Sequence, residues 1–192
     1  MPGLHLLLWA GLSLPNIFPG ERILNDHSPA PWKVGEQLVY GVSWTGINVG
    51  QAILQVPVRK VFGGRPCYLI QALTRGNRFI NSIYKVEDRV ESWVDTHNLQ
   101  PLRFSKILRE GHYKKDEHID FDWAARIATY RRRKWKEPGE VYKLLGEVPF
   151  GPQVHDPLSS ICYLRLLKFG VGNTVSLIVN TDKGNWEIRA TI

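Results

Sequence analysis

The strongest concentration of charge in the chain is a basic run interrupted by aromatic residues. It reads Tyr130-Arg131-Arg132-Arg133-Lys134-Trp135-Lys136. Guanidinium and ammonium groups beside aromatic rings suit phosphate-bearing partners such as lipid headgroups, lipopolysaccharide or nucleic acid. A basic run near the end of a hairpin also commonly forms a solvated edge that discourages aggregation. The run therefore predicts contact with an anionic surface, and the solvated edge is the alternative. The residues of this prediction are Arg131, Arg132, Arg133, Lys134, Trp135 and Lys136.

One arginine lies among apolar residues of a predicted helix. Arg165 follows Leu158 by seven positions and Ile161 by four, so it shares a helical face with them. A buried guanidinium needs a carboxylate or several carbonyls, because burial of an unpaired charge is costly. Arg165 is therefore predicted to clamp a ligand, to pair with a carboxylate on a strand, or to extend its charged end to solvent. The candidate carboxylates are Asp88, Glu91 and Asp95.

Tyr40 and Trp44 are the aromatic candidates for ligand binding. They belong to an alternating segment in which Leu38 and Val42 also point to one face. Aromatic residues of this kind usually fill a core. On the concave face of a curved sheet they can instead line a groove for an acyl chain, a glycan or a peptide.

The histidines offer a different chemistry, that of a hydrolase acting on envelope material. His155 and Ser159 lie near Asp156, but Asp156 fits a helix N-cap and no glycine-flanked elbow surrounds the serine. His112 and His118 lie near aspartates at a spacing that matches no metal motif. We therefore assign no catalytic residue, no metal and no cofactor from the sequence.

The elements that position these residues begin with a hairpin. Thr45, Gly46, Ile47 and Asn48 have the composition of a tight turn between the alternating segment and a second strand over 49–56. Further strands are predicted over 67–73, 82–87, 89–94, 102–109, 112–121 and 126–135, and a last hairpin over 174–192. Short connections and the lack of alternating helices predict a mainly β fold. We expect an antiparallel meander that forms a strongly curved sheet or an open β-barrel.

One buried helix is predicted over about 157–169. Asp156 is placed as its N-cap, Pro157 as its first residue and Gly170 just after its end. Apolar residues cover most of its sides, so we expect it to pack against the sheet or in the mouth of the barrel.

Length and composition predict a single domain with an exported location. The chain has 192 residues, 43% of them hydrophobic, and a formal charge of +7. Residues 1–14 resemble a signal-peptide leader, residues 15–31 have the composition of a linker, and residues 32–192 form the β-rich domain. Because the last predicted strand meets no turn signal, we expect the domain to be truncated at its C-terminus. Cys67 and Cys162 are either two core thiols or, in an oxidising compartment, a disulfide.

Several short motifs, in order and spacing, resemble a known family. They are Gly35-Glu36-x-Leu-x-Tyr40-x-Val-x-Trp44-x-Gly46-x-x-Val49-Gly50, Tyr84-x-Val-x-Asp88, Ser92-x-x-Asp95, Leu99-x-Pro101, Phe121-Asp122, and Asp156-Pro-Leu-Ser159 with Tyr163-Leu-Arg165. From about residue 32 to its end the chain is similar to the bacterial domain of unknown function 3108. The resemblance implies an exported, β-rich protein of Gram-negative-type bacteria that has no established activity or catalytic residues. Gly41 and the basic stretch from Arg131 to Lys136 depart from its pattern.

These features favour an uncharacterised, non-enzymatic protein of the cell envelope or periplasm. We expect it to be a binding or scaffold module for an amphipathic ligand, with a lipid, a glycan or an envelope protein as its partner. The alternatives are a hydrolase and a basic protein that binds an anionic membrane surface. Export would remove nucleic acid from reach.

Overall fold

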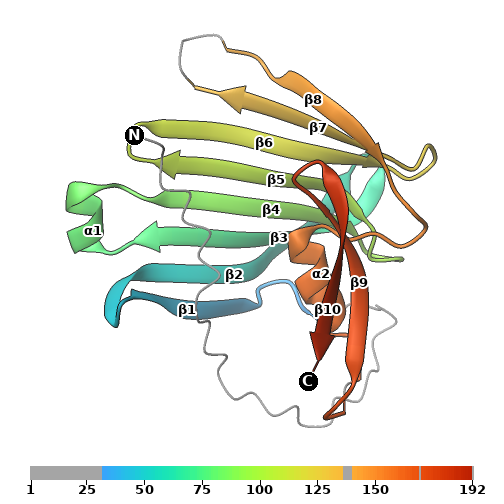
Figure 1. The fold of residues 1–192 in the computed structure, drawn as a ribbon, viewed down its shortest axis with the longest axis horizontal. Helices are drawn as coiled ribbons and strands as arrows, with labels where there is room; N and C mark the ends of the chain where they lie inside the picture. Colours follow the sequence, from blue (N-terminus) through green and yellow to red (C-terminus); the bar gives the residue numbers. More distant parts are fainter. Residues whose placement is uncertain (1–31, 136–139, 169, 192) are drawn as a thin grey trace.

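A computed structural model describes residues 32–135, 140–168 and 170–191. Their strands form an eight-stranded antiparallel sheet in the order β1 to β8 and a separate two-stranded sheet of β9 and β10 (Figure 1). The expected mainly β fold with an antiparallel meander is confirmed, and the sheet is curved and open. The predicted leader, 1–14, and the predicted linker, 15–31, lie outside the described residues.

The elements follow one another with short connections. The large sheet contains β1 (Gln37–Trp44), β2 (Ile47–Phe62), β3 (Arg65–Gly76), β4 (Glu87–Asp95), β5 (Pro101–Glu110), β6 (Tyr113–Asp122), β7 (Ile127–Lys134) and β8 (Lys143–Pro149). The helices are α1 (Arg78–Ile83) and α2 (Pro157–Leu164), and the small sheet contains β9 (Thr174–Thr181) and β10 (Gly184–Thr191).

The predicted hairpin at the start of the domain is confirmed. Its two turn residues, Thr45 and Gly46, have positive φ angles of 49° and 82°, the backbone of a tight turn that matches strand twist. Gly50 is a site of close approach between β2 and β3. A Cβ there would lie 2.3 Å from the carbonyl oxygen of Arg75, so only glycine fits without a backbone shift.

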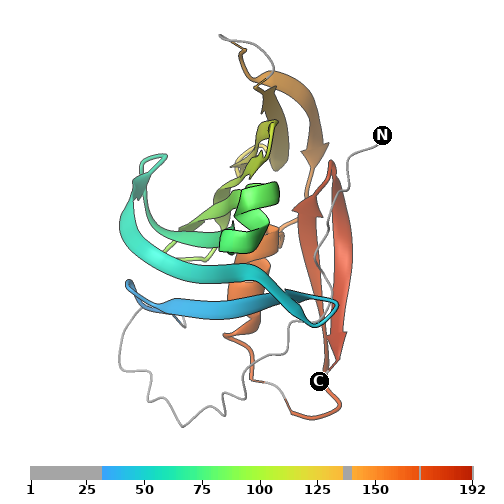
Figure 2. The same cartoon turned by 90° about the vertical axis from the view of Figure 1, so that its left-hand side faces the viewer.

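The curvature of the large sheet follows from strand twist and from irregular pairing. The register of β2 with β3 shifts between Gln55 and Val58, and Pro57, which has no N–H to donate, lies inside this shift. Similar shifts occur in the pairs β1–β2, β4–β5 and β7–β8. Figure 2 shows the sheet curling around α2 and the β9–β10 hairpin.

The hydrophobic core lies between the concave face of the sheet and these two elements. Ile70, Phe104 and Ile119 of the sheet are buried together with Leu158 and Cys162 of α2. The hairpin is attached by hydrogen bonds, because the backbone N–H of Asn180 donates to the carbonyl of His155 at 2.8 Å. The helix and the hairpin therefore cover the part of the concave face where the core residues are packed.

The N-terminus of α2 is as predicted, but its C-terminus is not. Asp156 caps the helix and forms a capping box with Ser159, and Pro157 is the first helical residue. The helix ends at Leu164, so the predicted end at 169 is wrong. The N–H of Arg165 donates to Cys162 and that of Leu166 to Tyr163, both i to i−3 bonds that tighten the chain into turns.

Two other elements differ from the sequence prediction. Residues 82–87 were expected as strand, but Ser82 and Ile83 complete helix α1, whose N-cap Asn77 accepts a hydrogen bond from the N–H of Ile80. The strand β8 was not predicted. Within the described residues Cys67 and Cys162 are buried free thiols, and no described helix is long and apolar enough to cross a membrane.

Candidate functional site

One row of side chains crosses the concave face from β1 to β8 and changes character halfway. Cross-strand pairing aligns one residue of every strand, in the order Leu38, Leu54, Ala72, Val90, Lys106, Glu117, Arg132 and Lys143. We call these residues the concave row. The first four, the apolar strip, are uncharged and half-buried, whereas the last four are all charged. Residues paired in register share one face, so this face is apolar on one side and ionic on the other.

Two further lysines extend the ionic side. Lys115 and Lys134 are directly opposite each other on β6 and β7, and alternation places them on the same face as Glu117 and Arg132. Like charges directly opposite each other normally destabilise a sheet. We call Lys106, Lys115, Arg132, Lys134 and Lys143 the basic strip. Among the described residues, Lys134 and Lys143 have no carboxylate within ion-pair distance.

Glu117 is the carboxylate at the centre of the basic strip. Arg132 Nε donates to its Oε1, and Lys115 Nζ lies 3.1 Å from its Oε2. Burial alone would raise the pKa of Glu117, but the hydrogen bonds from Arg132 and Lys115 outweigh it, so the pKa lies below its usual value. Glu117 therefore stays ionised and fixes these two cations in place, and the strip keeps an excess of positive charge.

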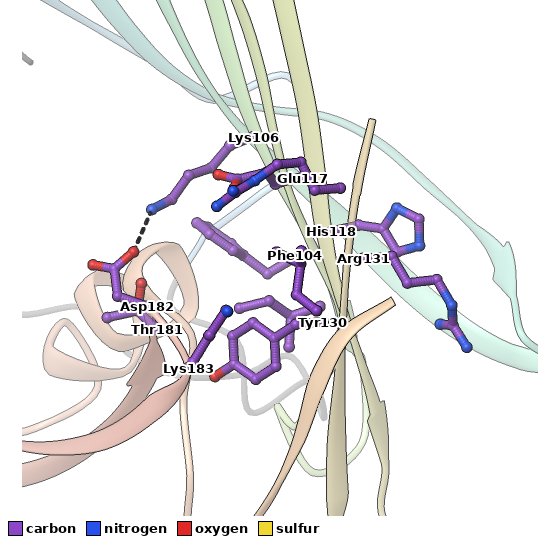
Figure 3. Close-up of a pocket in the computed structure, with 12 residues that line it drawn as sticks. Phe104, Lys106, Glu117, His118, Tyr130, Arg131, Thr181, Asp182 and Lys183 are labelled. Carbon is purple, nitrogen blue, oxygen red and sulfur yellow. Dashed lines mark hydrogen bonds and ion pairs between the residues drawn. The ribbon is translucent and has the colours of Figure 1, made fainter. Parts of the chain in front are cut away.

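A small pocket lies where the β9–β10 turn meets the basic strip (Figure 3). Its volume is about 50 Å³, and Lys106, Arg132 and Lys183 are among its lining residues. Lys106 Nζ reaches Asp182 Oδ1 at 3.6 Å and joins the turn to the sheet. Ligand pockets for drug-sized molecules measure roughly 300–1,000 Å³. This pocket can admit water or the edge of an anionic group, but not a whole lipid or sugar.

A wider, open hollow lies beside β1 and β2, on the apolar side. Its volume is about 380 Å³, and Tyr40, Gly50 and Arg75 are among the residues that line it. Gly41, Gly50 and Gly76 are also among its lining residues. Tyr40 comes two positions after Leu38 of the concave row and, by strand alternation, lies on the same face. The predicted ligand residue Tyr40 is thus at the edge of the candidate site.

The other two predicted ligand residues lie at opposite ends of β1. Trp44 is the last residue of the strand and is 62% exposed. Arg165 forms an ion pair with Glu36, just before the strand, with 2.6 Å between Nη1 and Oε1. Eight residues of strand span about 26 Å. The structure therefore does not bring Arg165 and Trp44 together, and the partner of Arg165 is none of the three carboxylates considered from the sequence.

The basic run of β7 is divided between the two faces of the sheet. Arg131 and Arg133 lie on the convex face, where they contact Asp120 and Asp116 at 2.7 and 2.8 Å. Arg132 and Lys134 lie on the concave face, and Trp135 stacks on the guanidinium of Arg133 with 3.9 Å to the ring centre. The last residue of the predicted contact, Lys136, lies outside the described residues.

The three histidines are not brought together. His118 lies on the convex face beside Asp120, with 3.5 Å between Nε2 and Oδ2, so these two residues share a face. His155 stacks on Tyr163, and burial lowers its pKa to about 4. His112 follows the β5–β6 turn residue Gly111. No group of three or more metal-ligating side chains occurs in the described part of the chain.

Ser159 is engaged in the helix cap. Its hydroxyl accepts the N–H of Asp156 at 2.8 Å and donates to the carbonyl of the same residue at 3.2 Å. The carboxylate of Asp156 accepts the N–H groups of Leu158 and Ser159 and the hydroxyl of Ser92. The serine proton is therefore directed at a backbone carbonyl and away from a base.

The sequence reasoning missed Lys106, Glu117 and Lys143 as site residues. Each is a single charged residue in an alternating strand, which usually indicates a solvent-exposed face. Only the register of eight strands shows that they form one row. A signal was available in Lys115 and Lys134, which lie directly opposite each other once the two neighbouring strands, predicted over 112–121 and 126–135, pair as a hairpin.

The protein is mainly β and has an open, curved sheet. Core residues fill part of the concave face of this sheet, and the concave row crosses the same face beside them. The chain belongs to the family described as protein of unknown function (DUF3108), which it matches over residues 39–192. Comparison with curated proteins found no match. Comparison with solved structures found none either.

Proposed function

We propose that this protein is a non-enzymatic binding module of the cell envelope that holds an anionic amphiphile across the concave row. The apolar chain of the amphiphile would lie along the apolar strip, and its phosphate or carboxylate would contact the basic strip. The change from apolar to ionic side chains halfway along one row is the observation that carries the proposal. A ligand with an apolar chain and an anionic head matches the two parts of this surface.

The energetics favour an anionic head over a neutral one. Lys134 and Lys143 make no ion pair within the described residues, so an incoming anion need not displace a carboxylate from them. A basic residue near an anionic lipid surface contributes about 1 kcal/mol, and a basic concave surface adds to local attraction. Two such lysines support a preference of about tenfold or more for an anionic head.

The apolar strip gives the chain a surface to cover. Leu54, Ala72 and Val90 pack against the core from its edge and keep part of their surface accessible. Each buried methylene of an acyl chain contributes about 0.8 kcal/mol. A binding role fits better than hydrolysis, because His118 lies on the other face of the sheet and Ser159 is held in a helix cap.

The envelope location is part of the proposal. It is supported by the leader-like composition of residues 1–14 and by the positive charge of the chain, +7. Anionic amphiphiles are abundant at such a location. A protein with an amphipathic concave face could carry or sequester them there.

Binding can be tested with lysophosphatidylglycerol below its critical micelle concentration, followed by isothermal titration calorimetry on the full chain. Lysophosphatidylcholine, with the same acyl chain and a zwitterionic head, and glycerol phosphate, which has no chain, serve as comparison ligands. We expect the anionic lysolipid to bind about tenfold or more tightly than either. Equal affinity for the two lysolipids would contradict the role of the basic strip.

Matched variants locate the site. Lys134→Glu with Lys143→Glu should weaken binding of the anionic lysolipid by about tenfold or more, whereas Lys60→Glu, an exposed lysine on β2 outside the strip, should leave it unchanged. Val42→Gln, on the same face as the apolar strip, should weaken both lysolipids. If the Lys60 variant and the double variant bind equally, the proposed site is wrong.

A further inference from the structure

The connections of a meander alternate between the two ends of its sheet, and one end differs from the other in its side chains. At one end lie the β1–β2 turn, α1, the β5–β6 turn and the two residues that flank the β7–β8 connection, Trp135 and Tyr142. Figure 1 shows α1 and the β1–β2 hairpin at this same end. We call this end of the sheet the rim.

Large apolar and aromatic side chains at the rim are exposed to solvent. Their exposed fractions reach 62% at Trp44, 65% at Ile47, 67% at Phe79 and 73% at Ile83. Tyr84, Tyr113, Trp135, Val141, Tyr142 and Leu144 are exposed there as well. Surface apolar residues that occur singly are ordinary, but a group collected on neighbouring turns marks an interaction surface.

At the opposite end of the sheet, large side chains of two turns fold inward. Leu99, in the β4–β5 turn, is buried in the core. Trp123, in the β6–β7 turn, packs against Phe150 and donates its Nε1–H to the carbonyl of Pro101 at 2.7 Å. Val61 of β2 is exposed at this end too, but the large side chains of the β4–β5 and β6–β7 turns fold inward, whereas those of the rim turns and α1 stay exposed.

Cations without carboxylate partners accompany these aromatic residues. Arg75 at the end of β3, Arg78 at the start of α1 and Lys114 at the start of β6 are exposed. None of the three has a carboxylate within ion-pair distance among the residues that the structure describes. Lys85 is paired with Glu87 at 3.1 Å. The rim therefore combines insertable apolar groups with positive charge that is not compensated locally.

We infer that the rim is a docking surface for an anionic lipid bilayer. Aromatic residues are enriched at the level of lipid headgroups, where an apolar ring and a polar edge are both satisfied. Basic residues beside them are attracted by the negative potential of anionic headgroups. The exposed groups project from separate turns and a short helix, and the cations lie between them. This mixture suits a fluid, charged interface better than the charge-depleted core of a protein interface.

The bilayer is a second partner, distinct from the single amphiphile proposed for the concave row. Docking of the rim and binding at the concave row can each be disproved without the other. Lys134 and Lys143 lie where β7 ends and β8 begins, so the basic strip opens toward the rim. An amphiphile that left a docked membrane would meet the basic strip first.

Vesicle flotation of the full chain tests the docking surface. The vesicles contain phosphatidylcholine alone or equal parts of phosphatidylcholine and phosphatidylglycerol. The variants are Phe79→Ser with Ile83→Ser, which removes the exposed apolar groups of α1, and Arg78→Glu, which reverses an unpaired charge. Val61→Ser is the control, because Val61 is 73% exposed but lies at the opposite end of the sheet. Thermal unfolding of every variant establishes that it is folded.

We expect flotation with the anionic vesicles only, weakened by added salt, reduced about tenfold or more by each rim variant and unchanged in the control. In lysolipid titration the rim variants should bind with wild-type affinity. The vesicle result then tests the rim independently of the proposed site on the concave row. Failure of the wild-type chain to float, or equal flotation of control and rim variants, would overturn the inference. A protein that co-purifies with the wild type and is lost from the rim variants, without any flotation, would replace the bilayer by a protein partner.

Discussion

Replacement of Asp156 by asparagine should uncover a pH dependence of stability that the wild-type protein hides. Asp156 is completely buried. Its Oδ1 accepts the N–H groups of Leu158 and Ser159 at 2.8 and 3.0 Å, and its Oδ2 accepts the hydroxyl of Ser92 on β4 at 2.5 Å. It therefore links the N-terminus of α2 to the sheet, and asparagine can keep the acceptor for the helix cap.

Burial raises the pKa of Asp156 from 3.8 to about 6, even though its hydrogen bonds oppose the shift. The folded state thus binds a proton more tightly than the unfolded state does. The resulting stabilisation is fully present below the unfolded pKa of 3.8 and is lost as pH rises through about 6. At 1.36 kcal/mol per pKa unit, its size is about 3 kcal/mol.

The neighbouring His155 has the opposite effect. Its ring is largely buried against Tyr163, its Nδ1 has no hydrogen-bond partner among the described residues, and burial lowers its pKa from 6.5 to about 4. The neutral ring is favoured in the folded state, so this contribution is present above pH 6.5 and is lost as pH falls through about 4. Its size is again about 3 kcal/mol. Between pH 4 and 6.5 the two contributions nearly cancel.

Urea denaturation at a series of pH values measures the free energy of unfolding directly. From pH 4 to 6.5, the stability of Asp156→Asn should rise relative to wild type by about 3 kcal/mol, because only the histidine contribution is left. His155→Phe, which keeps a ring against Tyr163, should show a fall of similar size. If the profiles of the two variants run parallel to wild type, Asp156 and His155 do not have the opposing pH-dependent contributions described above.

Three other changes test the packing that supports the site. Gly50→Ala should lower the free energy of unfolding by about 2 kcal/mol in thermal or urea denaturation, since its Cβ would meet a carbonyl oxygen of β3 at 2.3 Å; Gly41→Ala, whose nearest atom would be the side-chain amide nitrogen of Asn48 at 3.6 Å, should cost less. Tyr130→Phe removes the 2.6 Å hydrogen bond to the buried Asn180 and should cost about 1–2 kcal/mol by the same measurement; no loss would mean that the bond contributes nothing. Asp116→Asn weakens a buried carboxylate that holds two arginines and an indole N–H, and should cost about 3 kcal/mol, which a shift of the urea midpoint at neutral pH would show.

Local signals in the sequence predicted the elements whose ends are fixed by local chemistry. The hairpin turn follows from Thr45 and Gly46, and the start of α2 follows from the Asp156 cap. The same kind of signal failed at the other end of α2, where Gly170 suggested a helix end about five residues beyond Leu164. Helix α1 was missed because a contact with a distant part of the chain helps to hold it in place. The side-chain amide of Asn77 donates a hydrogen bond to the carbonyl of Asn48 on the first hairpin. No sequence pattern within 77–84 reveals this contact.

The candidate site could not be predicted because it depends on strand register, which local sequence patterns do not give. Alternation along each strand assigns a face, but a register shift such as the one between Gln55 and Val58 changes which residues become neighbours. The meeting of Val90 with Lys106, where the concave row changes from apolar to ionic, follows only from the pairing of β4 with β5. Tyr40 was predicted from its aromatic character alone, and the row was visible only in the folded sheet.

Photo-crosslinking can show where an amphiphile lies on the protein. The probe is a lysophosphatidylglycerol that carries a diazirine at the end of its acyl chain, and the adducts on the full chain are located by peptide mass spectrometry. A ligand along the concave row should give adducts on the apolar side of the concave face, in 37–44, 49–56 and 86–92, and these should be lost when unlabelled lysophosphatidylglycerol is added in excess. Adducts concentrated on β9 and β10, or labelling that unlabelled lipid does not displace, would contradict a site along the concave row.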